Sequence, residues 1–180
     1  TSAYNQVQEE GFQDKISVRK GDGLDVLNPG EATCITIAGM GGTLISSILE
    51  RGKDKLVGTQ RLVLQPNIQA INIRKWLLAN DWELINEAIL EEDGKIYEVL
   101  VAEKGNAEAP YSEKKESELL LGPFLMKECS DVFRQKWVAE MKHWRTIIEQ
   151  LERSGKTDSS QEKQQQLKRN IAFVEEALSL

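Results

Sequence analysis

Short apolar runs separated by turn residues mark the first hundred positions of this chain. Residues 32–38 (ATCITIA) are β-branched and apolar on both faces, which predicts a buried, central and parallel strand. Residues 61–67 (RLVLQPN) predict a second short buried strand, closed by its proline. Ile16 and Val18 alternate with polar neighbours, and this alternation predicts a further strand that ends at a Gly-Asp-Gly turn.

Apolar residues at helical spacing lie between these runs. The spacing predicts helices over residues 2–10, 43–51 and 68–79. Residues 82–91 and 95–104 follow as two strand-like runs, and the Glu-Asp-Gly between them is a strong hairpin signal. Strands that alternate with helices and end in a hairpin predict an α/β fold with an open, mostly parallel sheet whose last strand is antiparallel to its neighbour.

A different pattern begins after residue 108. Residues 105–118 are polar and contain glycine and proline, as a linker does, and a helix is predicted to begin near Ser117. Farther on, apolar residues recur in steps of four and three, which predicts two helices packed as an antiparallel coiled-coil hairpin. The predicted seam consists of Trp137, Met141, Trp144, Ile148 and Leu151 in one helix and Leu167, Ile171, Val174 and Leu178 in the other. The predicted domains are therefore residues 1–108 and residues 109–180, and the second is either a binding surface or a stabilising appendage or dimer contact.

Charge is distributed unevenly between these two regions. Residues 1–109 carry 11 Lys/Arg and 17 Asp/Glu, whereas residues 110–180 carry 12 of each, so neither region advertises a basic nucleic-acid-binding face. No apolar run approaches the roughly 20 residues of a membrane span. Cys34 and Cys129 lack metal-ligand spacing and His143 has no ligand partner nearby, so we expect no metal site. Two buried free thiols would suit a reducing cytosol, and the protein is expected to be cytoplasmic.

The turns that follow the three predicted strands carry the candidate chemistry. In an open α/β sheet, ligands bind outside the carboxyl ends of the strands. The three turns are Gly21-Asp22-Gly23, Gly39-Met40-Gly41-Gly42 and Gln65-Pro66-Asn67. Glycine lets a ligand approach the backbone closely, a carboxylate accepts hydrogen bonds, and an asparagine amide both donates and accepts. Each turn alone is also compatible with a purely structural role, but their coincidence at three strand ends favours a binding site.

The sequence lacks residues that several common types of binding and catalytic site require. A dinucleotide-binding loop needs a third glycine where Leu44 stands, and a phosphate-binding P-loop needs Gly-Lys-Ser/Thr. With one histidine there is no Ser-His-Asp or Cys-His set. Chemistry that proceeds by aligning two reactants, with little acid-base assistance, remains open.

Five features in this order carry a resemblance to a known family. They are VRKGDGLDVL (18–27), IAGMGG (37–42), LVLQPN (62–67), GKIYEVL (94–100) and the terminal helical hairpin. Together they resemble the bacterial tRNA (adenine-22-N1)-methyltransferase family, TrmK type, over nearly the whole chain. The resemblance implies a Rossmann-like class I methyltransferase sheet with a C-terminal coiled coil, S-adenosylmethionine as cofactor, and methyl transfer to N1 of an adenine in the D-arm region of tRNA.

The resemblance also implies roles for individual residues. The Gly-Asp-Gly turn would end the family's third strand, where an acidic residue commonly faces the adenine of the cofactor. The implied cofactor-binding residues are Gly21, Asp22, Gly23, Leu24, Ala38, Gly39 and Met40. The residues implied around the methyl group and the target base are Gly39, Met40, Gly41, Gly42 and Asn67, with Gln65 and Pro66 beside them. Within that set, we expect Met40 to pack against the base and Asn67 to bind its exocyclic amine.

A tRNA substrate would require phosphate contacts from basic side chains. The candidates are Lys136, Lys142, Arg145, Lys168 and Arg169, all on the predicted hairpin. The alternative for these residues is a solvated helix face with i,i+4 pairs to Glu140 and Glu149.

The chain departs from the family at its start. The family carries a glycine-rich loop after its first strand and an acidic residue after its second, and neither is present here. We therefore expect that an upstream segment belongs to the protein, because the strand at 34–38 would otherwise lose a neighbour. Two alternatives to the tRNA hypothesis stay open: a methyltransferase for another substrate, and a non-enzymatic interaction protein that uses the helical hairpin.

Overall fold

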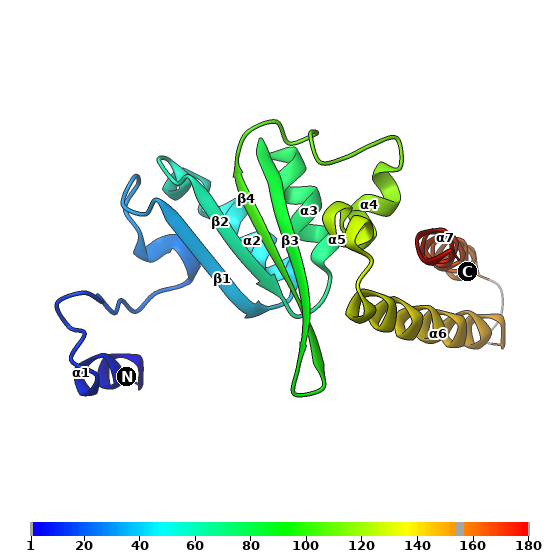
Figure 1. The fold of residues 1–180 in the computed structure, drawn as a ribbon, viewed down its shortest axis with the longest axis horizontal. Coiled ribbons are helices and arrows are strands. Elements are labelled where there is room, and N and C mark those ends of the chain that lie inside the picture. Colours follow the sequence, from blue (N-terminus) through cyan, green and yellow to red (C-terminus); the bar gives the residue numbers. More distant parts are fainter. Residues whose placement is uncertain (1, 154–156, 180) are drawn as a thin grey trace.

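A four-stranded mixed sheet forms the centre of the molecule (Figure 1). The structure is a computed structural model that describes residues 2–153 and 157–179. The strands β1 (Cys34–Met40), β2 (Arg61–Pro66), β3 (Trp82–Glu92) and β4 (Lys95–Lys104) lie in the order β1-β2-β4-β3. β1 and β2 are parallel, whereas β4 is antiparallel to both β2 and β3. The predicted α/β class and the hairpin are confirmed, and parallel pairing among the described residues is confined to β1 and β2.

β1 lies at the edge of this sheet. Its side chains alternate, with Ile35 and Ile37 buried and Cys34, Thr36 and Ala38 exposed. The prediction of a central strand buried on both faces is therefore wrong for the described residues, because β2 alone pairs with β1 there. The expected burial of the cysteines is also wrong: Cys34 is exposed and Cys129 is half-buried.

The strand predicted around Ile16 and Val18 does not form. Both side chains are exposed, at 48% and 36%, and no described strand pairs with this segment. A short alternating pattern makes a strand only where a neighbour supplies hydrogen-bond partners for its backbone. The Gly-Asp-Gly turn leads instead into a 3-10 helix, η1 (Gly23–Val26). The predicted first helix is confirmed as α1 (Ser2–Glu9), which buries none of its residues.

Two helices cover the buried face of β1 and β2. They are α2 (Gly42–Arg51), which is followed by the 3-10 helix η2 (Lys53–Leu56), and α3 (Ala70–Ala79). Their buried positions recur at helical spacing, as the sequence predicts. These positions are Ile45, Ile48 and Leu49 in α2 and Ile73, Trp76 and Leu77 in α3. They join Leu62 and Leu64 of β2 in one hydrophobic core, which holds the sheet ends in place.

The C-terminal region is helical but interrupted. It contains α4 (Lys115–Leu121), α5 (Pro123–Glu128), α6 (Asp131–Arg153) and α7 (Asp158–Leu178). The helix predicted near Ser117 is thus divided at Gly122, with φ of 95°, and at Cys129, with φ of 47°. Positive φ is incompatible with a continuing right-handed helix.

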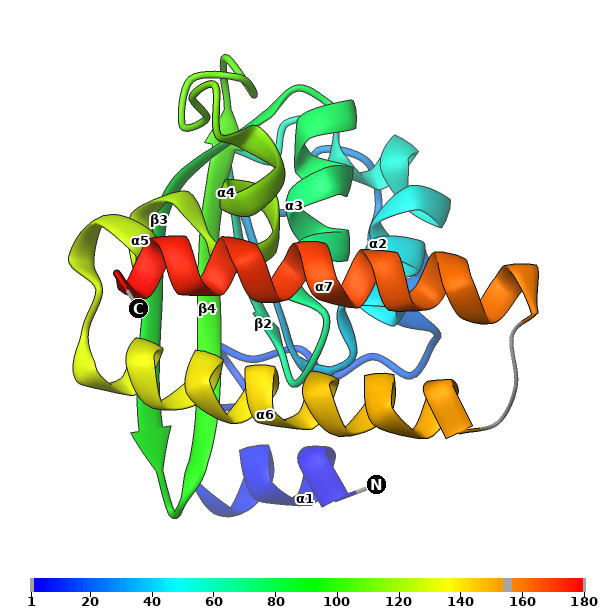
Figure 2. The same ribbon diagram turned by 90° about the vertical axis from the view of Figure 1, so that its right-hand side faces the viewer.

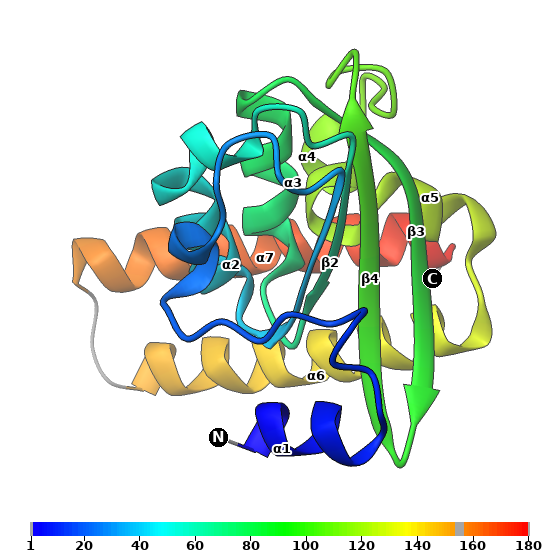
Figure 3. The ribbon, with the colours of Figure 1, turned by 90° about the vertical axis from the view of Figure 1, so that its left-hand side faces the viewer.

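The last two helices form the predicted antiparallel hairpin, which lies across the helical side of the molecule (Figure 2). Trp137, Met141 and Ile148 of α6 and Leu167, Val174 and Leu178 of α7 are buried, which confirms the seam. Thr157 caps α7 through a reciprocal hydrogen-bond pair with Ser160. From the opposite side, β3 and β4 lie in front of the hairpin (Figure 3), so this face of the sheet carries no helix from the hairpin.

A buried ion cluster joins α3, the β3–β4 hairpin and the C-terminal helices. The guanidinium of Arg74 donates from Nε to Glu87 Oε1 at 2.7 Å and from Nη2 to Glu98 Oε2 at 2.9 Å. Its Nη1 donates to the carbonyls of Leu119 and Leu120 at the end of α4. Glu87 Oε2 accepts from the backbone N–H of Phe124 at 3.1 Å. Because every hydrogen-bonding side of Arg74 is used by a different element, the cluster fixes the helices on the sheet.

Candidate active site

The carboxyl ends of β1 and β2 meet, as the sequence predicts. The N–H of Gly39 donates to the side-chain Oε1 of Gln65 at 2.9 Å. Beyond a bulge between Ala38 and Met40, the N–H of Asn67 donates to the Met40 carbonyl at 2.8 Å. The two candidate turns therefore form a single unit whose backbone hydrogen bonds are made between them.

The turn of residues 39–42 contains three glycines, whose local environments differ. Gly39 has φ of 78°, a conformation that other residues rarely adopt. A Cβ on Gly42 would lie 2.1 Å from the carbonyl oxygen of Gln69, so only glycine fits beneath the start of α3. Gly41 has an ordinary φ of −70°, and a Cβ there would meet only Ile68, at 3.7 Å. A Cβ on Gly39 would meet nothing within 4 Å, so Gly39 and Gly41 are the two positions of this turn where the backbone lies open to a ligand.

Side-chain hydrogen bonds hold the two turns together. The Thr43 hydroxyl donates to Gln69 Oε1 at 2.7 Å and accepts from Asn72 Nδ2 at 2.7 Å. Gln69 stands at the start of α3 in the left-handed region, with φ of 60°. Neither Thr43 nor Gln69 was singled out from the sequence, because the two residues are 26 positions apart and meet only where the starts of α2 and α3 pack together.

The side chains of Asn67 and Met40 differ in how far they are available to a ligand. Asn67 is exposed, and its Oδ1 accepts a long hydrogen bond, 3.4 Å, from Gln65 Nε2. Such an amide can exchange this partner for a ligand. Met40, in contrast, packs against the hydrophobic core. Met40 is only half-buried, and the expected contact of its side chain with a bound base stays a prediction.

Asp22 lies away from these turns. It pairs with Arg51, at the last residue of α2, with 3.1 Å between Oδ2 and Nη1. Gly42 is the first residue of α2, and nine residues of helix rise separate the two ends by roughly 13 Å. The structure thus brings together two of the three predicted turns, and the assignment of Gly21, Asp22 and Gly23 to the cofactor stays a prediction.

Leu24 is a core residue in this structure. Its side chain is buried, and a Cβ on Gly52 would lie 2.6 Å from it. The assignment of Leu24 to the cofactor stays a prediction, and its buried side chain leaves the backbone as the part of the residue that a ligand could reach.

The basic candidates on the hairpin are mostly engaged in ion pairs. Lys136 is largely buried and pairs with Glu98 of β4, so it is not a free phosphate ligand. Burial, and next the charge of Arg74, lower the pKa of Lys136 to about 8. Arg145 pairs with Glu175 at 2.8 Å across the hairpin, so the predicted i,i+4 pair with Glu149 is replaced by an interhelical one.

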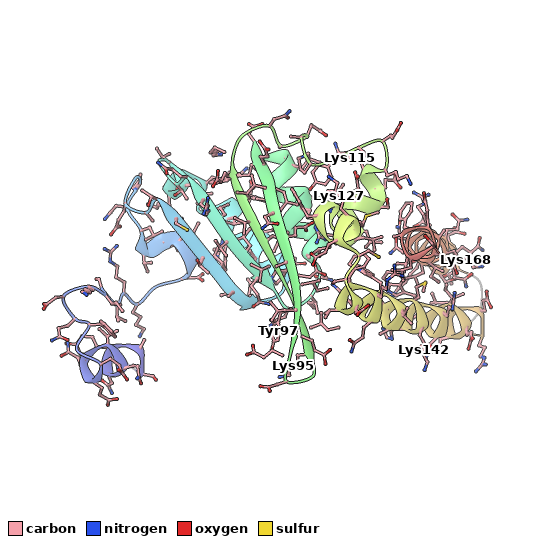
Figure 4. All side chains as sticks on the ribbon, in the orientation of Figure 1. Lys95, Tyr97, Lys115, Lys127, Lys142 and Lys168 are labelled. Carbon is pink, nitrogen blue, oxygen red and sulfur yellow. The ribbon has the colours of Figure 1, made fainter. Side chains whose placement is uncertain are left out.

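The remaining basic candidates lie on the outer surface. Lys168 and Arg169 have long pairs, 3.8 Å to Glu152 and 3.5 Å to Glu116. Lys142 and Lys168 project from the outer sides of α6 and α7 (Figure 4). Among the residues that the structure describes, no group of three or more metal-ligating side chains occurs. In the same part of the chain, none of the helices combines the length and the apolarity that a membrane crossing needs.

A pocket of about 270 Å³ adjoins the site on the side of α6. We call it the α6 pocket. Its lining comes from residues 66–70, from the β3–β4 hairpin and from α6, and includes Asn67, Ile68, Gln69, Glu98, Lys136 and Ala139. Ile68 was not singled out from the sequence, although an apolar residue directly after a Pro-Asn turn is a signal that could have drawn attention to it.

Comparisons with known proteins identify the family. The family model for tRNA (adenine(22)-N(1))-methyltransferase, TrmK, matches residues 1–176. The tRNA (adenine(22)-N(1))-methyltransferase of Bacillus subtilis is 50% identical over 178 residues, 98% of this chain and 75% of the relative.

Solved structures agree with this assignment. The crystal structure of the B. subtilis m1A22 tRNA methyltransferase TrmK matches with a TM-score of 0.93 and 49% identity, covering 98% of this chain and 76% of that one. A putative tRNA (m1A22) methyltransferase of Streptococcus pneumoniae in complex with S-adenosyl-L-methionine matches with a TM-score of 0.79 and 40% identity, covering 98% and 75%. The chain therefore belongs to the TrmK family of tRNA (adenine(22)-N(1))-methyltransferases.

Proposed function

We infer that this protein transfers the methyl group of S-adenosylmethionine to N1 of adenine 22 of tRNA. The observation that carries this conclusion is the 50% identity to the B. subtilis enzyme along 98% of the chain. The fold agrees, with a TM-score of 0.93 to the corresponding crystal structure. The relative from S. pneumoniae was solved with S-adenosyl-L-methionine, which supports the same cofactor here.

The residues at the end of β1 fit the methyl-donating part of this cofactor. Ala38 and Gly39 are exposed at the open edge of the sheet, and the only side chain within 4 Å of a Cβ placed on Gly41 would be that of Ile68. When bound, S-adenosylmethionine supplies an activated methyl group on its sulfonium. The α6 pocket, at about 270 Å³, lies below the roughly 300–1,000 Å³ of pockets that enclose drug-sized ligands, so it does not hold the whole cofactor.

Methyl transfer to adenine N1 requires mainly that the protein aligns the two reactants. The N1 atom of neutral adenine carries a lone pair, and its methylation forms a cation, so no proton has to leave before the new C–N bond forms. The described turns carry no histidine, since the single histidine of this sequence, His143, lies on α6. Gly41 would let the base approach the backbone, and Asn67 Oδ1 would accept from the exocyclic amine. Rate enhancement would come from orientation and exclusion of water.

The target base must leave the RNA stack to reach these turns. We take residues 1–108 as the unit that carries out the reaction and residues 109–180 as the unit that contacts tRNA. Lys142, Lys168 and Arg169 are the basic residues of the hairpin best placed for phosphate contacts, because their charges are exposed and their pairs are long or absent from the described contacts. Such a substrate and two unpaired cysteines suit a cytoplasmic protein.

The test is direct. The purified protein is incubated with unmodified tRNA and methyl-labelled S-adenosylmethionine, and the RNA is digested to nucleosides. Label in 1-methyladenosine is the expected result. Label in another nucleoside would favour a different methyl acceptor, and no label with intact cofactor binding would favour a substrate other than tRNA. Absence of cofactor binding would favour an interaction protein.

A further inference from the structure

The α6 pocket is separated from the open backbone at Gly41 by a single apolar side chain. Ile68 Cγ1 lies 3.7 Å from the position that a Gly41 Cβ would take, and the same side chain lines the α6 pocket. Ile68 is nevertheless 65% exposed, although it is a large aliphatic residue beside a well-formed core. An exposed aliphatic side chain between two binding spaces is the arrangement by which proteins separate stacked bases.

The chemistry of the α6 pocket suits a base and not a phosphate. Its charged lining consists of Glu98, Glu140 and Lys136, so its formal charge is negative. Lys136 already pairs with Glu98, which leaves no free cation for a phosphate. Glu98 is buried and engaged by Arg74 and Lys136, so the acceptors open to an exocyclic amine are the Glu140 carboxylate and the exposed Asn67 amide. The neighbouring Ile68 and Ala139 offer apolar surface to a ring.

The size of the α6 pocket supports the same conclusion. About 270 Å³ is small for a cofactor but sufficient for one ring system. The pocket is bounded by residues 66–70, which belong to the site, and by α6, which belongs to the hairpin. An RNA strand held by the hairpin and presenting its target at Gly41 would therefore pass over it.

We propose that the α6 pocket receives a nucleobase directly next to the methylated adenine, and that Ile68 stands between the two bases. The proposal rests on the function inferred above and deepens it, since it assigns a second base-binding site within the same RNA.

The test combines a pocket-filling variant with RNA that lacks one base. Ala139 is exposed on α6 and lines the pocket, so Ala139→Trp fills it without disturbing the core. Val138 is the preceding residue, 49% exposed and not among the lining residues, so Val138→Trp is the matched control. Each protein is assayed with intact tRNA and with transcripts that carry an abasic site immediately 5′ or 3′ of the target adenine. Thermal melting and binding of S-adenosylhomocysteine check that each variant is folded.

The proposal predicts a non-additive result. For wild type and Val138→Trp, one of the two abasic sites should lower kcat/KM about tenfold, the scale of one lost base contact. Ala139→Trp should be about tenfold slower on intact tRNA and should lose little more on that abasic RNA, because the contact is already gone.

Four outcomes would overturn it. Ala139→Trp could match wild type, or the abasic site could slow both proteins by the same factor, and either result would disconnect the pocket from the neighbouring base. A third outcome is that Ala139→Trp methylates none of the RNAs while wild type is insensitive to both abasic sites. That result would instead place the target adenine itself in the pocket. A wild-type protein that makes no 1-methyladenosine would refute the proposed function, and this inference with it.

The separating role of Ile68 has its own variant. Ile68→Ala is expected to lower kcat for tRNA about tenfold while the KM for S-adenosylmethionine stays unchanged, since the Ile68 side chain contacts the RNA bases and not the cofactor. Val57→Ala, which shortens another exposed aliphatic residue, 64% exposed and remote from the pocket, is the control. Equal kcat values for the two variants would refute the role of Ile68.

Discussion

At the residue scale, the adjacent glycines 41 and 42 have different roles: Gly42 is needed for packing, whereas Gly41 leaves room for a ligand. A Cβ on Gly42 would collide with the carbonyl of Gln69 at 2.1 Å, whereas a Cβ on Gly41 has room. We therefore expect Gly42→Ala to lower the melting temperature by several degrees, as strain of about 1–3 kcal/mol does in a protein of this size. Gly41→Val should melt close to wild type but lose methylation, because its branched side chain occupies the space for the ligand. Differential scanning calorimetry and the methylation assay distinguish the two, and an active Gly41→Val enzyme would contradict the open-backbone interpretation.

The lowered pKa of Lys136 predicts how the free energy of unfolding depends on pH. Burial and the nearby Arg74 lower its pKa from 10.5 to about 8, although Glu140 and Glu87 favour the charged form. Between these two values the unfolded chain holds a proton that the folded protein has released, so stability from this group rises with pH. Wild type should therefore gain about 2 kcal/mol more than Lys136→Met between pH 7 and pH 9.5. Urea unfolding of both proteins at the two pH values measures this difference, and parallel curves would contradict it.

At the element scale, the Arg74 cluster fixes the C-terminal helices on the sheet. Arg74 and Glu87 are fully buried, so removing the guanidinium leaves the Glu87 carboxylate without a counter-charge, whereas Glu98 keeps Lys136. Arg74→Met should lower the free energy of unfolding by about 3–5 kcal/mol. Arg61→Met, which breaks the exposed pair with Glu103, is the control and should cost at most about 1 kcal/mol. Similar losses for the two variants in urea unfolding would show that the buried cluster does not hold the elements together.

Elements with strong local signals were predictable from the sequence, and elements that depend on distant partners were not. The hairpin of β3 and β4 and the seam of α6 and α7 follow from turn residues and apolar spacing, and both formed as predicted. The alternation at Ile16 and Val18 carries no information about a neighbouring strand, and none pairs with it in the described residues. Likewise, residue 122 must be glycine because a side chain there would meet Arg74 and Glu87 within 3 Å, a contact that only the fold reveals.

At the scale of the whole molecule, the candidate site was only partly predictable. Two strand ends meet because parallel neighbours bring their carboxyl ends to one edge, which the sequence order already implies. Ile68 and the α6 pocket depend on how the helical hairpin packs on β4, for which no local pattern exists. The ion pairs of Lys136 and Arg145 were missed for the same reason, since their partners lie on β4 and α7.

The outer charges of the helical hairpin lead to a prediction on salt dependence. Replacing Lys142 and Lys168 with glutamine should weaken tRNA binding and reduce the slope of log affinity against log salt by about 1–2, one unit for each lost phosphate contact. Lys53→Gln with Lys55→Gln, in η2 and remote from the hairpin, is the matched control. Filter binding at several salt concentrations gives both slopes. An unchanged slope for the hairpin variant would indicate that other surfaces hold the RNA.

The position of the methyl group tests the central claim most directly. Two tRNA transcripts are compared, one unaltered and one with guanine in place of adenine 22, and the methyl groups incorporated per molecule are counted by mass spectrometry. We predict about one methyl group, in 1-methyladenosine at position 22, for the unaltered transcript and none for the altered one. Equal incorporation into both transcripts would show that the protein methylates a different position and would contradict the assignment.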